Sequence, residues 1–288
     1  MKGFRYERID ADGTTINTAI GGSGPPLLLL HGYPQTHMIW HRVAPALAAD
    51  FTVVATDLRG YGDSAKPAPG PADVEYSKRA MARDQVHVMR TLGFPEFAVA
   101  GHDRGGRVAH RMALDHPQAV TALAVLDIVP TRYVFQHADK DFGMGYYHWF
   151  FLAAPNGIPE RLIGNDSEFW IRARMTARHA GGTPFAPEAM DEYVRCFDAD
   201  SIAASCSDYR AAAGIDLVHD NTDAHRKLTC PTLALWGRDS FVGQNYDVLA
   251  TWRDYASTVT GKPLPSNHYV PEEAPTETTV ALREFLGR

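Results

Sequence analysis

The sequence predicts an α/β fold, in which helices wind around a mostly parallel sheet and a separate group of helices is inserted late in the chain. Two observations predict it. Short apolar runs alternate with amphipathic segments of about 10–15 residues over the first 130 positions, which is the pattern of repeated strand and helix units. From about 130 to 228 no convincing strand pattern is found, and a strand pattern then returns at 231–237.

Seven segments have the apolar or alternating character of strands. The first two form a hairpin with its turn at Asp12-Gly13, and the third follows Pro25-Pro26 directly. The later ones are short apolar runs, as expected for strands that are buried on both faces. The predicted strands are 4–9, 15–21, 27–30, 51–56, 97–100, 120–126 and 231–237.

The helices expected around the sheet are 39–48, 76–92, 104–115 and 277–286, and the inserted region offers 167–179, 187–197 and 201–213. We therefore predict a core domain made of 1–130 and 229–288, and a helical cap domain made of 131–228. No repeats or low-complexity segments interrupt this organisation.

Composition excludes several function classes. The chain has 288 residues, 45% hydrophobic and 22% charged, with a net charge of −6 and no basic block, which argues against nucleic acid and membrane surfaces as partners. No apolar leader is evident near the start, and the longest aliphatic run is far shorter than the roughly 20 residues of a membrane span. Cys196, Cys206 and Cys230 lack metal or disulfide spacing, so we expect a cytoplasmic protein with reduced thiols.

The most informative stretch is Gly101-His102-Asp103-Arg104-Gly105-Gly106-Arg107, which lies between a predicted strand and a predicted helix. It resembles the turn that presents a serine nucleophile, G-x-S-x-G, with aspartate in the place of serine. A helix N-cap is a common use of aspartate, but a carboxylate at such a turn also suits another reaction. Attack on an alkyl carbon by a carboxylate gives an ester that water can cleave, whereas attack by serine would give an inert ether.

Two arginines follow the aspartate, Arg104 and Arg107, at a spacing that places them on one face of the helix. If the substrate were itself a carboxylate, its repulsion with Asp103 at about 4 Å would cost roughly 4 kcal/mol, or about a thousandfold in rate. Two guanidinium groups can offset that repulsion and hold the substrate carboxylate bidentately. The pair therefore favours a small acid with a leaving group on its α-carbon.

The sequence resembles the fluoroacetate (haloacetate) dehalogenases of the α/β-hydrolase superfamily. The resemblance runs in order through most of the chain, in HGYPQTHMIWHRVAPALA, DLRGYGDSAKP, GHDRGGRVAHRMALDHP, LDIVPT, YYHWFFLAAP, SDYRAA and HYVPEEAP. GHDRG is the more specific segment, since related haloalkane dehalogenases and epoxide hydrolases typically carry tryptophan after the nucleophile. The resemblance implies an α/β-hydrolase fold with an inserted cap.

The resemblance also implies a role for each candidate residue. Asp103 would attack the α-carbon and expel halide, and His268, oriented by Asp127, would activate the water that hydrolyses the ester. Backbone N–H groups of Tyr33 and Arg104 would form the oxyanion hole. The remaining candidates are Arg104 and Arg107 for the substrate carboxylate, and His148, Trp149 and Tyr209 for the halide. The products would be glycolate and halide, without cofactor or metal, and the family suggests a homodimer.

Three alternatives stay open at this stage. Asp239 follows the next strand and is the reserve for Asp127 as the acid of the triad. An epoxide hydrolase would use the same nucleophile and base, with Tyr209 and either Tyr146 or Tyr147 protonating the opening oxygen. A protein of this fold that binds small acids without turnover is the third alternative.

Overall fold

The computed structural model describes residues 1–11, 13–176 and 183–287, and its centre is an eight-stranded sheet. The strand order is β1-β2-β4-β3-β5-β6-β7-β8; β2 is antiparallel to both its neighbours, and the strands from β4 to β8 are parallel. The strands are β1 (Arg5–Asp10), β2 (Thr15–Gly21), β3 (Pro26–Leu30), β4 (Thr52–Thr56), β5 (Phe97–His102), β6 (Val120–Leu126), β7 (Thr232–Gly237) and β8 (Val259–Leu264).

Helices cover both faces of the sheet because its strands are apolar on both sides. In β3, Leu28 and Leu30 pack in the core on the side of α2, α3 and α13, whereas Leu27 and Leu29 pack on the side of α1, α14 and α15. The surrounding helices are η1 (His37–Trp40), α1 (Ala44–Leu47), η2 (Pro71–Tyr76), α2 (Lys78–Thr91), α3 (Arg104–Asp115), α12 (Phe241–Asn245), α13 (Val248–Tyr255), α14 (Val270–Glu273) and α15 (Pro275–Leu286).

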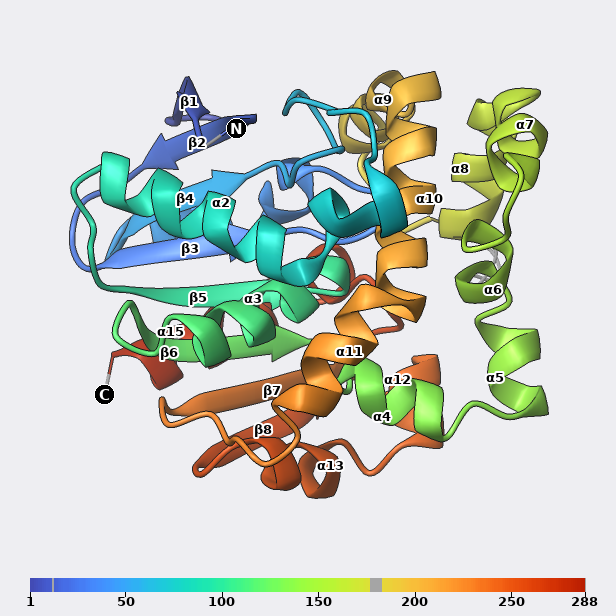
Figure 1. Cartoon of the computed structure of the whole chain (residues 1–288). Helices are drawn as coiled ribbons and strands as arrows, with labels where there is room; N and C mark the ends of the chain where they lie inside the picture. Colours follow the sequence, from blue (N-terminus) through green and yellow to red (C-terminus); the bar gives the residue numbers. More distant parts are fainter. Residues whose placement is uncertain (12, 177–182, 288) are drawn as a thin grey trace.

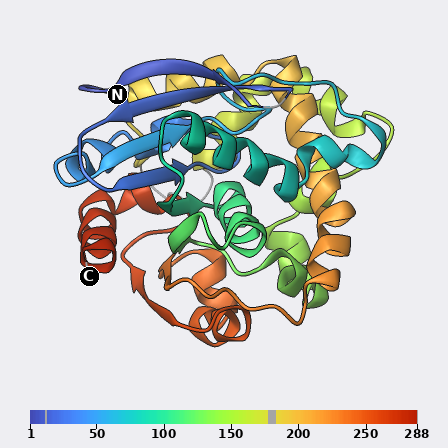
Figure 2. The ribbon, with the colours of Figure 1, turned by 60° about the vertical axis from the view of Figure 1, so that its left-hand side comes forward.

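A run of helices separates β6 from β7 and lies beyond the ends to which β4 and β6 point (Figure 1). In Figure 2, the inserted helix α10 and the C-terminal helix α15 lie on opposite sides of the view. No strand interrupts this insertion in its described residues, 127–176 and 183–231. The inserted helices are α4 (Thr131–Gln136), α5 (Lys140–Gly145), α6 (His148–Leu152), α7 (Ile158–Gly164), α8 (Ser167–Thr176), α9 (Pro187–Cys196), α10 (Ala199–Ala213) and α11 (Ile215–Thr222).

The predicted architecture, a mostly parallel sheet with an inserted helical region, is confirmed. Two of the differences from the sequence prediction lie in the core and have a local cause. The helix expected at 39–48 is a 3-10 turn followed by a short helix, because Pro45 cannot donate the hydrogen bond that would continue the first into the second. The edge strand β8 was not predicted. It carries Gly261 and Pro263, which weaken the apolar alternation typical of a strand. The predicted turn at Asp12 and the end of helix 167–179 lie outside the described residues.

None of the described helices is both long enough and apolar enough to cross a membrane.

Candidate active site

The turn between β5 and α3 holds Asp103 in a conformation that few side-chain-bearing residues adopt, with φ 46° and ψ −115°. Two glycines make room for it. A Cβ on Gly32 would lie 2.5 Å from the Cβ of Asp103, and a Cβ on Gly105 would lie 2.3 Å from the carbonyl oxygen of His31. The Asp103 side chain makes no capping bond to its helix, so the alternative of an ordinary N-cap aspartate does not describe this residue.

The carboxylate of Asp103 is buried and receives a hydrogen bond from the backbone N–H of Tyr33, at 3.1 Å from Oδ2. Burial alone would raise the pKa of Asp103, but the positive field of His268, Arg107 and Arg104 outweighs it and lowers that pKa below its ordinary value. None of these three forms an ion pair with Asp103 within 4 Å. The group is therefore an ionised carboxylate with an oxygen that the neighbouring side chains leave available.

His268 lies in the loop after β8, and its Nδ1 is 2.6 Å from Oδ2 of Asp127, which directly follows β6. The other carboxylate oxygen of Asp127 accepts the backbone N–H of Gly237 at 2.9 Å and the hydroxyl of Ser240 at 2.6 Å. These bonds fix the carboxylate, and the carboxylate fixes the imidazole with Nε2 directed away from it. The Nε2 of His102 lies 2.7 Å from the carbonyl oxygen of His268 and so donates a hydrogen bond that holds the same loop.

Asp239, the reserve for the acid of the triad, lies at the surface. Its side chain is 60% exposed and its nearest ionic partner is Arg238, at 3.9 Å. The structure therefore brings Asp127, and not Asp239, to His268.

The guanidinium groups of Arg104 and Arg107 lie side by side under two aromatic rings. The Cζ of Arg107 is 4.5 Å from the ring centre of Trp149, and the Cζ of Arg104 is 4.2 Å from that of Tyr209, which are cation–π distances. Arg104 is also paired with Asp208, whose Oδ2 accepts from Nε at 2.9 Å. The edge of Arg104 formed by Nε and Nη2 is therefore occupied by Asp208.

The three predicted halide-binding residues lie together although they come from different helices. Trp149 and His148 begin α6, Tyr209 lies in α10, and all three are buried. The ring of Tyr209 is 5.7 Å from that of His148 and 6.1 Å from that of Trp149, and Tyr33 stacks on His148 at 6.4 Å. The indole N–H of Trp149 makes no hydrogen bond within the described residues, so it can donate to a ligand.

Sequence reasoning missed two charged residues here. Asp208 lies within the quoted segment SDYRAA, but nothing in its spacing relates it to Arg104. Arg174 lies in α8, with Nη2 3.0 Å from both ring nitrogens of His148 and a buried Nε that makes no hydrogen bond to any residue the structure describes. A helical segment rich in arginine was the only signal, and such segments are usually solvated surfaces.

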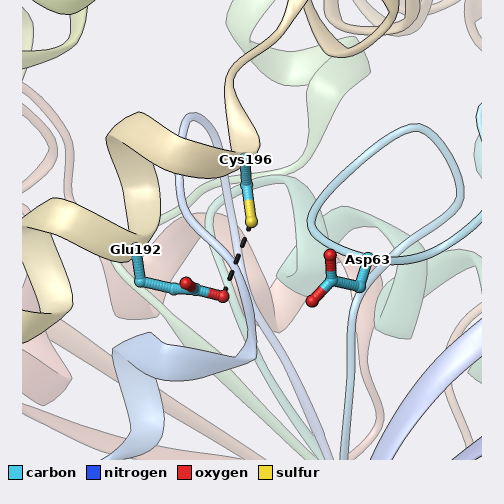
Figure 3. A group of neighbouring side chains, drawn as sticks. All are labelled: Asp63, Glu192 and Cys196. Atoms are coloured by element: carbon cyan, nitrogen blue, oxygen red, sulfur yellow. Dashed lines mark hydrogen bonds between the residues drawn. The ribbon is translucent and has the colours of Figure 1, made fainter.

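Cys196, Glu192 and Asp63 form a further cluster of potential metal ligands, with their ligand atoms within 4.8 Å of one another (Figure 3). The Sγ of Cys196 is 3.5 Å from an oxygen of Glu192. Arg195 already bonds both carboxylates, at 2.8 Å to Asp63 and 2.7 Å to Glu192. Because this guanidinium supplies the balancing positive charge, the cluster is an ion-pair group between α9 and the loop after β4.

The fold and this site together define a class of protein. Residues 25–275 match the family model of the α/β hydrolase fold, and the chain belongs to the α/β hydrolases. It is 44% identical to a fluoroacetate dehalogenase of Burkholderia sp, over 100% of this chain and 95% of the relative. It is 36% identical to a soluble epoxide hydrolase of Corynebacterium sp. (strain C12), over 92% of this chain and 91% of the relative.

Solved structures extend the likeness to the three-dimensional fold. A protein of Nostoc sp PCC 7120 assigned to the α/β hydrolases superposes with a TM-score of 0.97 at 53% identity, covering 98% of each chain. The epoxide hydrolase CorEH superposes with a TM-score of 0.89 at 31% identity, covering 99% of each chain. The chain is thus related to both dehalogenases and epoxide hydrolases.

Proposed function

We propose that this protein is a hydrolytic dehalogenase that converts a haloacetate, such as fluoroacetate or chloroacetate, to glycolate and halide. The observation that carries the proposal is the pair Arg104 and Arg107, buried beside the ionised nucleophile Asp103 and not ion-paired with it. A neutral substrate has no use for cations placed there, whereas a small carboxylate needs them.

In the first step an oxygen of Asp103 attacks the α-carbon, and the carbon–halogen bond breaks with its electron pair leaving on the halide. The product is an ester between Asp103 and the glycolyl carbon. The indole N–H of Trp149, the hydroxyl of Tyr209 and the ring of His148 would receive the halide. Arg174, which lies against His148, adds positive potential on that side.

In the second step the Nε2 of His268 takes a proton from water, and the water oxygen attacks the carbonyl carbon of the ester. Asp127 stabilises the imidazolium that forms. The resulting oxyanion would be held by the backbone N–H of Tyr33, already directed at this carboxylate, and by that of Arg104. Collapse releases glycolate and restores the carboxylate of Asp103.

The direct test is to measure halide released from fluoroacetate and chloroacetate side by side, with glycolate measured in the same samples. We expect halide and glycolate in equal amounts. In a single turnover in H₂¹⁸O, the label should enter Asp103 and not the first glycolate released. Chloride release without fluoride would restrict the substrate class to chloroacetate and its heavier analogues, and release of neither would overturn the proposal.

An epoxide hydrolase is the second candidate, supported by the Corynebacterium relative and by Tyr146. Tyr146 is buried, with its ring 6.3 Å from that of His268, so it could act with Tyr209 as an acid for the opening oxygen. Tyr147, the other tyrosine considered, is 48% exposed and is a poor donor for a buried reaction. Formation of a diol from a neutral epoxide, without halide release from haloacetates, would favour this candidate.

We also propose that 131–228 acts as a cap domain on the core of 1–130 and 229–288, and that the cap pairs with a second copy in a homodimer. The cap carries a group of exposed apolar side chains on α5 to α8, which water disfavours and a symmetric contact would cover. They are Met144, Tyr147, Phe150, Ile158, Leu162 and Phe169. Light scattering should give twice the chain mass, and Leu162→Glu with Phe169→Glu should give the monomer mass.

A further inference from the structure

Asp208 is a fully buried carboxylate from the cap helix α10 that lies against the core of the protein. Its Oδ2 accepts from Nε of Arg104 at 2.9 Å and from the hydroxyl of Tyr61 at 2.7 Å. Its Oδ1 accepts from Nη2 of Arg104 at 2.5 Å and from the ammonium group of Lys78. Both oxygens are thus shared between Arg104 and a second donor from the core.

These bonds use three of the five N–H donors of Arg104. Its Nη2 also donates to the backbone carbonyl of Asp208 at 2.8 Å, so the edge formed by Nε and Nη2 is filled. Nη1 is the nitrogen that remains, and it is buried without a hydrogen-bond partner among the described residues. A buried guanidinium nitrogen without a partner is costly, and a ligand that accepts its hydrogen bond would remove that cost.

Arg107 has the complementary arrangement. Its Nη1 donates to the carbonyl of Val129 and to the hydroxyl of Thr131, both at 3.0 Å. Within the described residues its Nε and Nη2 make no hydrogen bond, and Nε is buried. Arg107 therefore keeps a free two-pronged edge, whereas Arg104 keeps a single nitrogen.

Lys78 explains how a carboxylate can remain ionised at this depth. It pairs with Asp208 and also lies 3.3 Å from Asp216, which lies in the first turn of α11 and accepts the backbone N–H of Lys78 at 2.8 Å. Burial raises the pKa of Asp208, but Arg104 and Lys78 outweigh that effect and lower it. The cap thus contributes two acids to this boundary, and Asp208 is the one that touches Arg104.

We propose that Asp208 is a positioning residue for substrate recognition: it holds Arg104 by one edge so that Nη1 alone faces the substrate carboxylate, while Arg107 supplies the two-pronged contact. The carboxylate-binding group of the core is therefore completed by the cap. The inference rests on the proposed function, because it takes the ligand to be a small carboxylate.

The test compares Asp208→Asn with Asp216→Asn, a matched change in the same cap–core contact that does not reach Arg104. For each protein, KM and kcat for chloroacetate and the Kd of acetate, an unreactive carboxylate, are measured. For Asp208→Asn we expect KM and the acetate Kd to rise at least about tenfold, with a smaller fall in kcat. Asp216→Asn should keep all three near the wild-type values. Asp208→Glu, which keeps the charge, should recover part of the acetate affinity.

Asp208→Asn leaves two buried cations with less balancing charge and could fail to fold. The double variant Lys78→Met with Asp208→Asn removes one cation along with the anion, and Lys78→Met alone is its control. The same rise in KM and acetate Kd, relative to that control, is expected. The positioning role would be overturned if Asp208→Asn bound acetate as tightly as the wild type, or if the double variant bound it as tightly as Lys78→Met. This holds even where the wild-type protein turns over chloroacetate, so the proposed function would stand. A wild-type protein that neither binds acetate nor releases chloride would overturn the proposed function, and this inference with it.

Discussion

The core around the sheet and the proposed cap of inserted helices contribute to the candidate site in different ways. The core supplies Asp103, Asp127 and His268 on loops that follow the parallel strands β5, β6 and β8, and backbone N–H groups fix two of the three. The cap supplies Trp149 and Tyr209 from separate helices, and these side chains contact the core through stacking and cation–π contacts. The core positions its groups through the backbone, and the cap positions its groups through side chains.

This difference separates chemistry from selectivity. A nucleophile, a base and its acid are useful to a dehalogenase and to an epoxide hydrolase alike, which agrees with the likeness of this chain to both. We infer that the cap, together with the two arginines beneath it, selects the substrate. Changes in the core should therefore stop turnover for every substrate, and changes in the cap should alter preference among substrates.

The largest effect is expected from the core nucleophile. Asp103→Ala removes the attacking oxygen, so turnover of any haloacetate should fall by at least about 10⁴-fold. Halide release is the measurement, with an unchanged circular dichroism spectrum as the control for folding. Halide release at the wild-type rate would mean that another group attacks the substrate, and that the core loop after β5 does not supply the nucleophile.

The next effect separates the two chemical steps within the core. His268→Asn removes the base that activates water but leaves the first step intact. One equivalent of halide should be released per protein chain, after which turnover stops. Mass spectrometry should then find a carboxymethyl group on the peptide that contains Asp103. Normal multiple turnover in this variant would place the base elsewhere.

A stability effect of intermediate size is expected where the cap touches the core at Glu272. Its side chain is fully buried and accepts a hydrogen bond from Tyr193 of α9. Burial raises the pKa of Glu272 from 4.5 to about 7, so the folded state holds this proton more tightly than the unfolded state. The stabilisation is fully present below about pH 4.5 and is lost as the pH rises towards 7.

Wild-type protein should therefore lose about 2–3 kcal/mol of unfolding free energy from this group between pH 4.5 and 7. Glu272→Gln should lack that component. Urea unfolding at pH 5 and pH 8 measures the difference, with Glu277→Gln as the control because Glu277 is an exposed acid of α15. An equal pH dependence in wild-type protein and Glu272→Gln would contradict the assignment.

The smallest effect is expected in the cap. Trp149→Phe keeps a ring over Arg107 but removes the indole N–H. Fluoride concentrates its charge more than chloride does, so the loss of one donor should lower kcat for fluoroacetate by about tenfold and for chloroacetate by less. Ion chromatography of both halides measures the ratio. Equal losses for the two substrates would mean that Trp149 only packs against the arginine.

The difference between the core and the inserted helices also explains which elements could be predicted from the sequence. The ranges 104–115 and 120–126 match α3 and β6 at both ends, because each depends on a local apolar pattern and a nearby turn. In the insertion, the short helices α4, α5 and α7 were not predicted, because each is only six or seven residues long and depends on neighbours for its stability. Trp149 and Tyr209 were found through a family resemblance and not through their own patterns.

The sequence by itself determined the alternation of strands and helices, the turn that holds Asp103, and the presence of two arginines within one helical turn of it. These features depend on residues close together in the chain. Only the tertiary structure decided that Asp127 and not Asp239 reaches His268, and that Asp208, 104 positions away, occupies one edge of Arg104. Pairing between distant charges depends on where the cap packs against the core, and no spacing within the sequence encodes that contact.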